Sequence, residues 1–148
     1  MIYLGTDHRG FKLKERLKIW LDEEGHDFED LGAHALDSAD DYTTYAARAA
    51  AAVGRENSNR GIVLCGSGVG ADVTVNKFDG VRGAIGMEPA QVEAGRRDDD
   101  MNVLVIAADF TGETEAREMV EKFLSTSYDH LPRHQRRLDD IKKIEEDN

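Results

Sequence analysis

The stretch GIVLCGSGVGADVTVNK, from Gly61 to Lys77, indicates the fold more directly than any other part of the sequence. It opens with a short apolar run, Ile62 to Cys65, which is bounded by glycine and is typical of a strand buried on both faces of a sheet. Glycines follow at positions 66, 68 and 70, and a helical pattern comes after them. This order of strand, glycine-rich turn and helix directs backbone N–H groups and the positive end of a helix dipole toward one point beyond the sheet.

Cys65, the only cysteine in the chain, stands where this strand ends. A thiol beside a cluster of N–H donors suits an enzyme that transfers a proton and stabilises an oxyanion. The alternative is structural, because a tight strand-to-helix turn needs glycine for steric reasons and a lone cysteine is usually a small buried apolar residue. The even spacing of the glycines departs from the dinucleotide-binding fingerprint, and no phosphate-binding Gly-Lys-Ser/Thr loop is present, so a nucleotide-binding module is disfavoured.

The size and composition of the chain predict one globular domain, residues 1–148, with a substantial core. Hydrophobic residues make up 40% of it, yet no apolar run reaches membrane-spanning length and no signal sequence opens the chain. We therefore expect a cytoplasmic protein without membrane contact, and a single cysteine, which cannot form an internal disulfide, agrees with that compartment. The net charge of −11 argues against nucleic acid as a partner.

The acidic excess has a distinct composition, with 17 Asp against 13 Glu and 12 Arg against 7 Lys. Aspartates also occur in clusters, for example at positions 98–100. A surface that is rich in short carboxylates and poor in lysine fits a halophilic protein, because concentrated salt screens the self-repulsion. An ordinary acidic protein explains the same composition equally well, so both interpretations stay open.

Strand-like and helix-like segments alternate along the chain. The expected strands are residues 2–4, 26–31, 61–65, 82–85 and 103–107. The expected helices are residues 11–24, 42–53, a segment that contains 71–77, 88–97, 111 to about 124, and 133 to the end. This order predicts an α/β fold: a doubly wound, Rossmann-like parallel sheet of five strands with helices on both faces. The last helix carries an apolar face beyond the completed sheet, formed by Leu138, Ile141 and Ile144, and we expect it to pack on a partner subunit.

Sheets of this kind bind ligands at the carboxyl ends of their strands. Two turns leave from such ends, residues 5–10 after the first strand and residues 66–70 after the third. His8 and Cys65 are therefore expected to share one crevice.

Together these residues resemble the B-type ribose-5-phosphate isomerase family, which also contains the galactose-6-phosphate isomerase subunits. The resemblance covers nearly the whole chain and rests on five motifs in the same order: GTDHRGFKLK from Gly5, DYTTYA from Asp41, CGSGVG from Cys65 with the later Asn76-Lys77, NVL from Asn102, and RHQRR from Arg133. It implies an aldose–ketose isomerase, an intramolecular oxidoreductase of the pentose phosphate pathway that acts through a cis-enediol(ate) without metal or organic cofactor. It also implies a homodimer or homotetramer whose site is shared between subunits.

The resemblance implies a role for each residue of the site. Cys65 looks like the base that moves a proton between C1 and C2, which requires the glycine loop and the helix N-terminus to favour the thiolate. Ser67 looks like a proton relay to the substrate hydroxyls. The binding residues fall into three groups: N–H donors to the enediolate in Gly66, Ser67, Gly68, Val69 and Gly70; sugar-hydroxyl partners in Asp7, Tyr42 and Asn102; and phosphate partners in His8, Arg133 and Arg137. Judged alone, His8 also fits a turn histidine, Tyr42 a helix-start aromatic residue, and the two arginines a solvated pair.

Two aspartates depart from the family pattern. Asp98 stands where the family usually has a histidine that opens the furanose ring, so we expect Asp98 or a neighbour to take that catalytic role. Asp109 stands where the family often has a phosphate-binding arginine, and its negative charge should weaken phosphate binding.

The expected reaction is the conversion of ribose 5-phosphate to ribulose 5-phosphate. The alternatives are isomerisation of a tetrulose phosphate, a hexose phosphate or a uronate-type sugar acid, and a non-catalytic sugar-phosphate-binding subunit on the same fold. Retention of Cys65 beside an intact glycine loop favours an enzyme, because a protein that only binds the sugar does not need the thiol.

Overall fold

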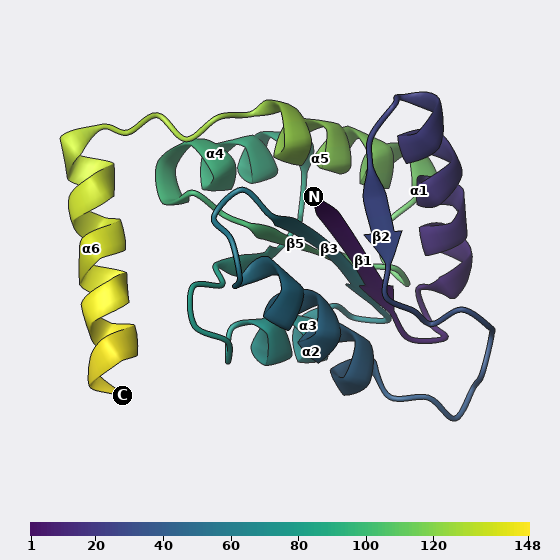
Figure 1. Ribbon diagram of the computed structural model, residues 1–148. Helices are drawn as coiled ribbons and strands as arrows, with labels where there is room; N and C mark the ends of the chain where they lie inside the picture. Colours follow the sequence, from purple (N-terminus) through teal and green to yellow (C-terminus); the bar gives the residue numbers. More distant parts are fainter.

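The computed structural model describes all 148 residues, which form a five-stranded sheet and six helices. The strands are β1 (Ile2–Thr6), β2 (Phe28–Asp30), β3 (Arg60–Cys65), β4 (Gly83–Ile85) and β5 (Val103–Ala107). They lie in the order β2-β1-β3-β5-β4, and every neighbouring pair is parallel. The predicted doubly wound, Rossmann-like sheet with helices on both faces is therefore confirmed (Figure 1).

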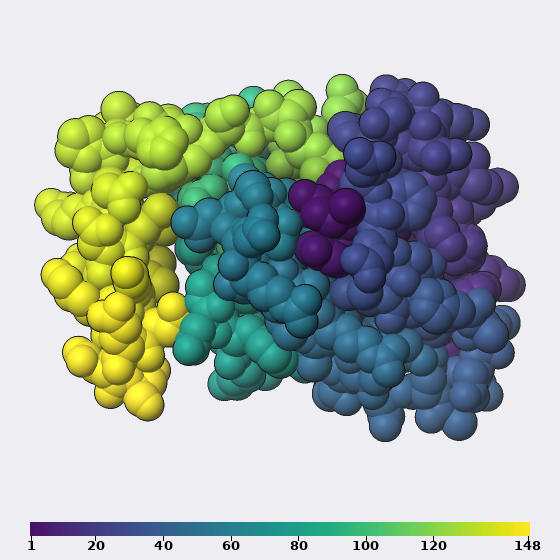
Figure 2. All heavy atoms as spheres, viewed as in Figure 1, coloured from purple at the N-terminus to yellow at the C-terminus, as the bar shows by residue number.

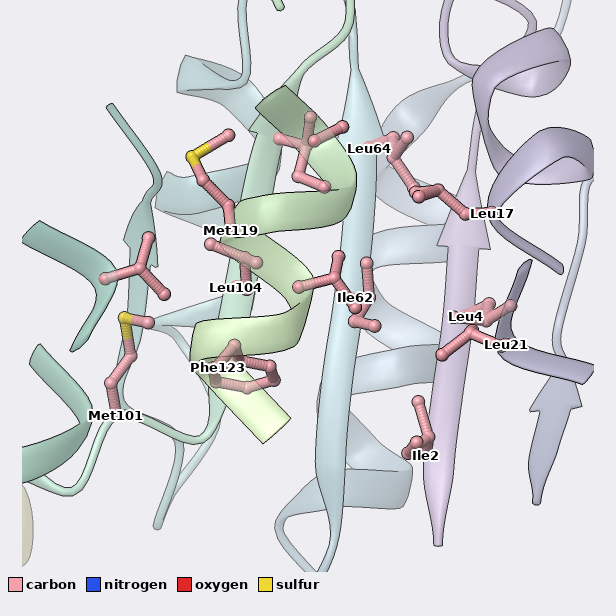
Figure 3. Close-up of a cluster of buried hydrophobic side chains, with 14 residues drawn as sticks. Ile2, Leu4, Leu17, Leu21, Ile62, Leu64, Met101, Leu104, Met119 and Phe123 are labelled. Carbon is pink, nitrogen blue, oxygen red and sulfur yellow. The ribbon is translucent and has the colours of Figure 1, made fainter. Parts of the chain in front are cut away.

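The two faces of the sheet carry separate hydrophobic cores, because side chains alternate between the faces along each strand. On one face, Ile62 and Leu64 pack with residues of α1 (Phe11–Glu23), α4 (Pro89–Asp99) and α5 (Glu113–Ser125), as Figure 3 shows for this cluster. On the other face, Val63 and Cys65 pack with α2 (Tyr42–Val53) and α3 (Val69–Val75). Strands β3 and β5 are thus buried on both sides, as their unbroken apolar runs indicated.

Several helix ends differ by one or two residues from the sequence prediction; α3, for example, ends at Val75 and does not reach residue 77. Helix α4 begins at Pro89, which suits the first helical position, but it continues to Asp99 and so places Asp98 in its last turn. Helix α5 begins at Glu113, two residues later than predicted, and its N-cap residue Gly112 provides no side-chain hydrogen bond. The carboxylates of Glu113 and Glu115 are favourable there, because the N-terminus of a helix carries partial positive charge.

Helix α6 (Pro132–Asp147) stands apart from the sheet (Figures 1 and 2). It packs on α4, and its first turn is fixed by His134, a buried residue whose Nδ1 lies 2.9 Å from Asp129 Oδ1. Ile141 and Ile144 remain 46% and 63% exposed, so the helix presents an apolar face to solvent and its packing on a partner stays a prediction. Neither α6 nor any other helix has the length and apolar character needed to cross a membrane.

Candidate active site

The carboxyl ends of β1, β3 and β5 meet at one edge of the sheet. In the parallel register Thr6 pairs with Leu64 and Cys65 pairs with Ala107, so the turns that follow these strands leave the sheet side by side. Helices α1 and α5 return over one face and α3 over the other, which separates the turns and leaves a crevice between them. An open cavity of about 740 Å³ lies there, lined by Asp7, His8, Arg9, Asp40, Asp41, Tyr42, Cys65, Gly66, Ser67, Val69, Gly70, Asp109 and Phe110.

Cys65 is the last residue of β3 and is almost fully buried although it lines the cavity. The N–H of Gly68 donates a hydrogen bond to Sγ with an N···S distance of 3.2 Å, and the N–H of Ala71 also interacts with the sulfur. Gly68 has a φ of +78°, a left-handed conformation that favours glycine, and this bend brings its N–H to the thiol.

The electrostatic environment of Cys65 opposes the thiolate. Burial raises the pKa of the thiol above its ordinary value, and the nearby carboxylates of Asp7 and Asp109 raise it further, against the two backbone N–H donors that lower it. The glycine loop thus acts in the expected direction, but burial of the sulfur and the two carboxylates, which come from the tertiary structure, outweigh it. The single chain therefore holds Cys65 as a thiol at neutral pH.

The rest of the glycine loop offers donors to a ligand. The Oγ atom of Ser67 accepts a hydrogen bond from the N–H of Val69 at 3.3 Å. The N–H groups of Ser67 and Gly70 have no partner within the chain, so both remain available at the cavity. Tyr42, the first residue of α2, lies with its ring against Gly70 and is 38% exposed.

Asp7 and His8 follow β1 and are held by neighbouring groups. Asp7 is buried and accepts a hydrogen bond from the N–H of Arg9 at 3.0 Å; burial raises the pKa of its carboxyl group. Asp40 accepts hydrogen bonds from the backbone N–H of His8 at 2.9 Å and from its ring Nδ1 at 2.6 Å. Because Nδ1 is occupied by Asp40, the Nε2 atom is the ring position left for a ligand.

Five predicted site residues do not line the cavity of the chain: Gly68, Asp98, Asn102, Arg133 and Arg137. The N–H of Gly68 is instead used by the sulfur of Cys65. Asn102 lies just before β5, at the opposite edge of the sheet, where its amide accepts a hydrogen bond from the N–H of Arg82 at 2.7 Å and donates to the carbonyl of Gly80 at 2.8 Å. Asp98 pairs with Arg97 at 2.7 Å, and this hydrogen bond lowers the pKa of its carboxyl group. The polar groups of Asn102 and Asp98 thus both have hydrogen-bond partners within the chain, away from the cavity.

Arg133 and Arg137 lie on α6, and neither residue lines the cavity. Figure 1 shows α6 on the opposite side of the molecule from the long loop between β2 and α2, which carries Asp40 and Asp41. A ligand in the cavity therefore could not contact these arginines from the same chain.

The sequence prediction missed Arg9, Asp40, Asp41 and Phe110 as cavity residues. A signal existed for Arg9, which lies beside His8 in the same turn. Asp40 gave no such signal, because its contact with His8 joins residues 32 positions apart. Asp109, which was singled out for its charge, does line the cavity and forms an ion pair with Arg9.

Two groups of side chains have ligand atoms close enough to hold a metal ion: Asp7, His8 and Asp40, and separately Asp98, Asp129 and His134. In each group the histidine Nδ1 already bonds an aspartate, Asp40 in the first and Asp129 in the second. Both groups are thus satisfied, at least in part, by hydrogen bonds among protein atoms.

Comparisons with known proteins agree with this geometry. Residues 2–141 match the family described as Ribose/Galactose Isomerase. The ribose-5-phosphate isomerase B of Escherichia coli (strain K12) is 35% identical over 145 residues, covering 98% of this chain and 96% of that protein. The corresponding protein of Mycolicibacterium paratuberculosis is 34% identical over 144 residues, covering 97% and 91%. The crystal structure of ribose-5-phosphate isomerase B from Mycoplasma genitalium with bound ribulose 5-phosphate superposes with a TM-score of 0.95 at 32% identity, covering 99% of this chain and 97% of that one.

Proposed function

Because the chain belongs to the ribose/galactose isomerase family, we propose that it is an aldose–ketose isomerase that interconverts ribose 5-phosphate and ribulose 5-phosphate. The observation that carries the proposal is the cavity in which Cys65 and the glycine loop meet Asp7, His8 and Tyr42. The structural relative from Mycoplasma genitalium with bound ribulose 5-phosphate supports this substrate.

In the proposed reaction, the Cys65 thiolate removes the proton from C2 of the open-chain aldose. The electron pair forms the C1–C2 double bond of an enediolate, and the proton returns to C1 as the ketose carbonyl forms at C2. The free N–H groups of Ser67 and Gly70 would donate to the enediolate oxygen, and a well-placed donor of this kind commonly contributes about 3–4 kcal/mol. The hydroxyl of Ser67 would carry a proton between O1 and O2, and Asp7 and Tyr42 would bind sugar hydroxyls.

The charge of the cavity supports a site completed by a second copy of the chain. Four aspartates and one arginine line it, which leaves a formal charge of −3 with His8 neutral. Both a phosphate group and a thiolate at Cys65 require more positive charge than this. We propose that a homodimer, alone or within a homotetramer, brings Arg133 and Arg137 of one copy to the cavity of the other, with the exposed apolar face of α6 at the interface.

Asp98 does not line the cavity of its own chain, so we propose that it acts on the substrate only in the cavity of a second copy. The hydrogen bond from Arg97 lowers the pKa of the Asp98 carboxyl group, which keeps it ionised, so it could accept a proton during ring opening but would not carry one to donate. Asn102 is left out of the binding site, because both ends of its amide are engaged with the backbone of residues 80–82.

The composition supports two further proposals about the setting of the enzyme. We propose a cytoplasmic location, in keeping with metabolic relatives such as the Escherichia coli protein. We also propose adaptation to concentrated salt, based on the net charge of −11 and the excess of Asp and Arg over Glu and Lys.

A direct test is to incubate the purified chain, in low salt and in molar KCl, with ribose 5-phosphate and to measure ribulose 5-phosphate formation. Parallel reactions would contain a tetrose phosphate, a hexose phosphate and a uronate. The proposal predicts the highest kcat/KM for ribose 5-phosphate. Preference for another sugar would reject this substrate, and binding of ribose 5-phosphate without turnover of any sugar would identify a non-catalytic subunit.

A further inference from the structure

Arg9 is the only arginine or lysine among the residues that line the cavity. It belongs to the turn after β1, and its backbone N–H donates to Asp7 Oδ1, which fixes the turn. Its side chain crosses to the turn after β5, where Nη2 pairs with Oδ2 of Asp109. The ion pair thus joins residues 100 positions apart and holds the guanidinium at the mouth of the cavity.

The guanidinium of Arg9 lies directly over Gly66, the residue after Cys65. A Cβ atom at position 66 would stand 3.3 Å from both Cζ and Nε of Arg9 and 2.9 Å from Oδ2 of Asp109. Glycine at this position therefore leaves room for the close approach of the ion pair, which a larger residue would displace. A ligand group that contacts Arg9 would lie beside the glycine loop and the thiol.

The pairing with Asp109 leaves most of the binding capacity of Arg9 unused. A guanidinium has five N–H donors in a fixed plane, and the Asp109 bond uses only Nη2. The side chain of Arg9 is 55% exposed, so the other donors are open to a ligand. The planar arrangement of these donors matches two oxygens of a phosphate group.

Resting on the proposed function, we infer that Arg9 binds the phosphate group of the substrate and that Asp109 positions the guanidinium for this contact. Any anion in the cavity faces the carboxylates of Asp7, Asp40, Asp41 and Asp109. Arg9 neutralises Asp109 and supplies the only permanent positive charge that the chain itself places there. This arrangement revises the expectation that Asp109 simply repels phosphate.

The test compares Arg9→Gln and Arg9→Lys with a matched control, Arg16→Gln. Arg16 also pairs with a carboxylate near the start of α5, its Nε lying 3.2 Å from Glu113 Oε2, and it is 65% exposed, but it does not line the cavity. The control therefore removes the same charge and a similar surface ion pair. The measured quantities are the Kd of inorganic phosphate, from calorimetric titration, and the kcat and KM for ribose 5-phosphate.

For Arg9→Gln, we expect the Kd of phosphate and the KM to rise by about ten- to a hundredfold, because the change removes charge-assisted hydrogen bonds to the anion. The kcat should change by less than about threefold, because this interaction is the same in the ground state and the transition state. Arg9→Lys should restore part of the affinity, because it keeps the charge and loses the planar donors. Arg16→Gln should leave all three quantities within about twofold of the wild type, because salt screens distant charges.

A Kd of phosphate for Arg9→Gln that matches that of Arg16→Gln would overturn the inference, as would a fall in kcat with unchanged KM. These results differ from a failure of the proposed function, in which the wild type binds phosphate through Arg9 but does not turn over ribose 5-phosphate.

Discussion

Replacing Lys14 with methionine tests how the fold holds the loop that leads to the candidate site. Lys14 lies on α1 and is fully buried, and its Nζ donates hydrogen bonds to Asp30 Oδ1 at 2.6 Å, to Asp30 Oδ2 at 2.7 Å and to the carbonyl of Ala33 at 2.7 Å. It therefore ties α1 to the end of β2 and to the start of the loop that carries Asp40.

The size of the effect depends on what remains around Asp30. Removing one partner of a buried ion pair typically costs about 3–5 kcal/mol. Asp30 would keep Lys18, whose Nζ lies 2.8 Å from Oδ2, and the N–H of Gly32 at 2.9 Å from Oδ1. Methionine also fills the space of the lysine stem, so we expect a loss near the lower limit, about 3 kcal/mol in the free energy of unfolding.

The decrease in the free energy of unfolding caused by Lys14→Met should also depend on pH. Burial raises the pKa of Asp30, but the hydrogen bonds from Lys14, Lys18 and Gly32 lower it to a net value below the ordinary 3.8. A carboxyl group whose pKa is depressed by folding contributes stability above its unfolded pKa and loses it as the pH falls through the folded pKa. The difference between wild type and Lys14→Met should therefore be largest near neutral pH and become smaller below about pH 4.

Urea denaturation followed by circular dichroism at pH 7 and pH 3 would measure this difference. Lys12→Met is the matched control, because it removes the same charge from an exposed position of the same helix. If Lys14→Met unfolds within about 0.5 kcal/mol of Lys12→Met at pH 7, the reasoning about this buried contact is wrong.

Three further predictions concern assembly, the thiol and salt. Deleting residues 132–148 removes α6 with Arg133 and Arg137. The shortened chain should be a monomer by light scattering and inactive in turnover assays. An active monomer of the full chain would contradict a site shared between subunits. The rate of Cys65 alkylation by iodoacetamide should still increase with pH above the ordinary thiol pKa of about 8.5, because the pKa of this thiol is raised. Asp109→Asn should shift this pH–rate profile to lower pH. An unchanged profile would show that the Asp109 carboxylate does not raise the pKa of the thiol. The melting temperature should rise with KCl up to molar concentration, and a flat or falling curve would reject adaptation to salt.

Much of the fold could be predicted from the sequence, because it depends on local periodicity and on the connection rules of parallel sheets. The bounds of α2 and β5 agree with the prediction at both ends, since each is a continuous apolar or alanine-rich run closed by a glycine or a polar turn. The meeting of His8 with Cys65 followed from the rule that parallel strands end at one edge. The order and parallel direction of the strands therefore determine that these two residues lie close together.

The contacts that complete the site were not predictable, because they join residues that are distant in sequence. Asp40 reaches His8 only because the loop after β2 folds back over the strand ends, and Arg9 meets Asp109 across the turn that follows Cys65. The N–H donors of the glycine loop lower the pKa of the thiol, as the motif indicated, but the net direction also depends on burial and on carboxylates from other turns, which the motif does not contain. Asn102 lies beside a strand that leads to the site, but at the opposite end of it.

The central claim is that Cys65 transfers the substrate proton, and solvent exchange measures this step most directly. Ribose 5-phosphate would be incubated in ²H₂O with wild type, Cys65→Ser and Cys65→Ala, with circular dichroism to verify folding and NMR to follow deuterium at C1 of the ketose and C2 of the aldose. We predict incorporation by the wild type, a trace with Cys65→Ser, and a rate lower by at least about 10²–10⁴-fold with Cys65→Ala, the range expected for loss of a general base. Exchange by folded Cys65→Ala at a rate near that of the wild type would contradict the account and remove the thiol from the mechanism.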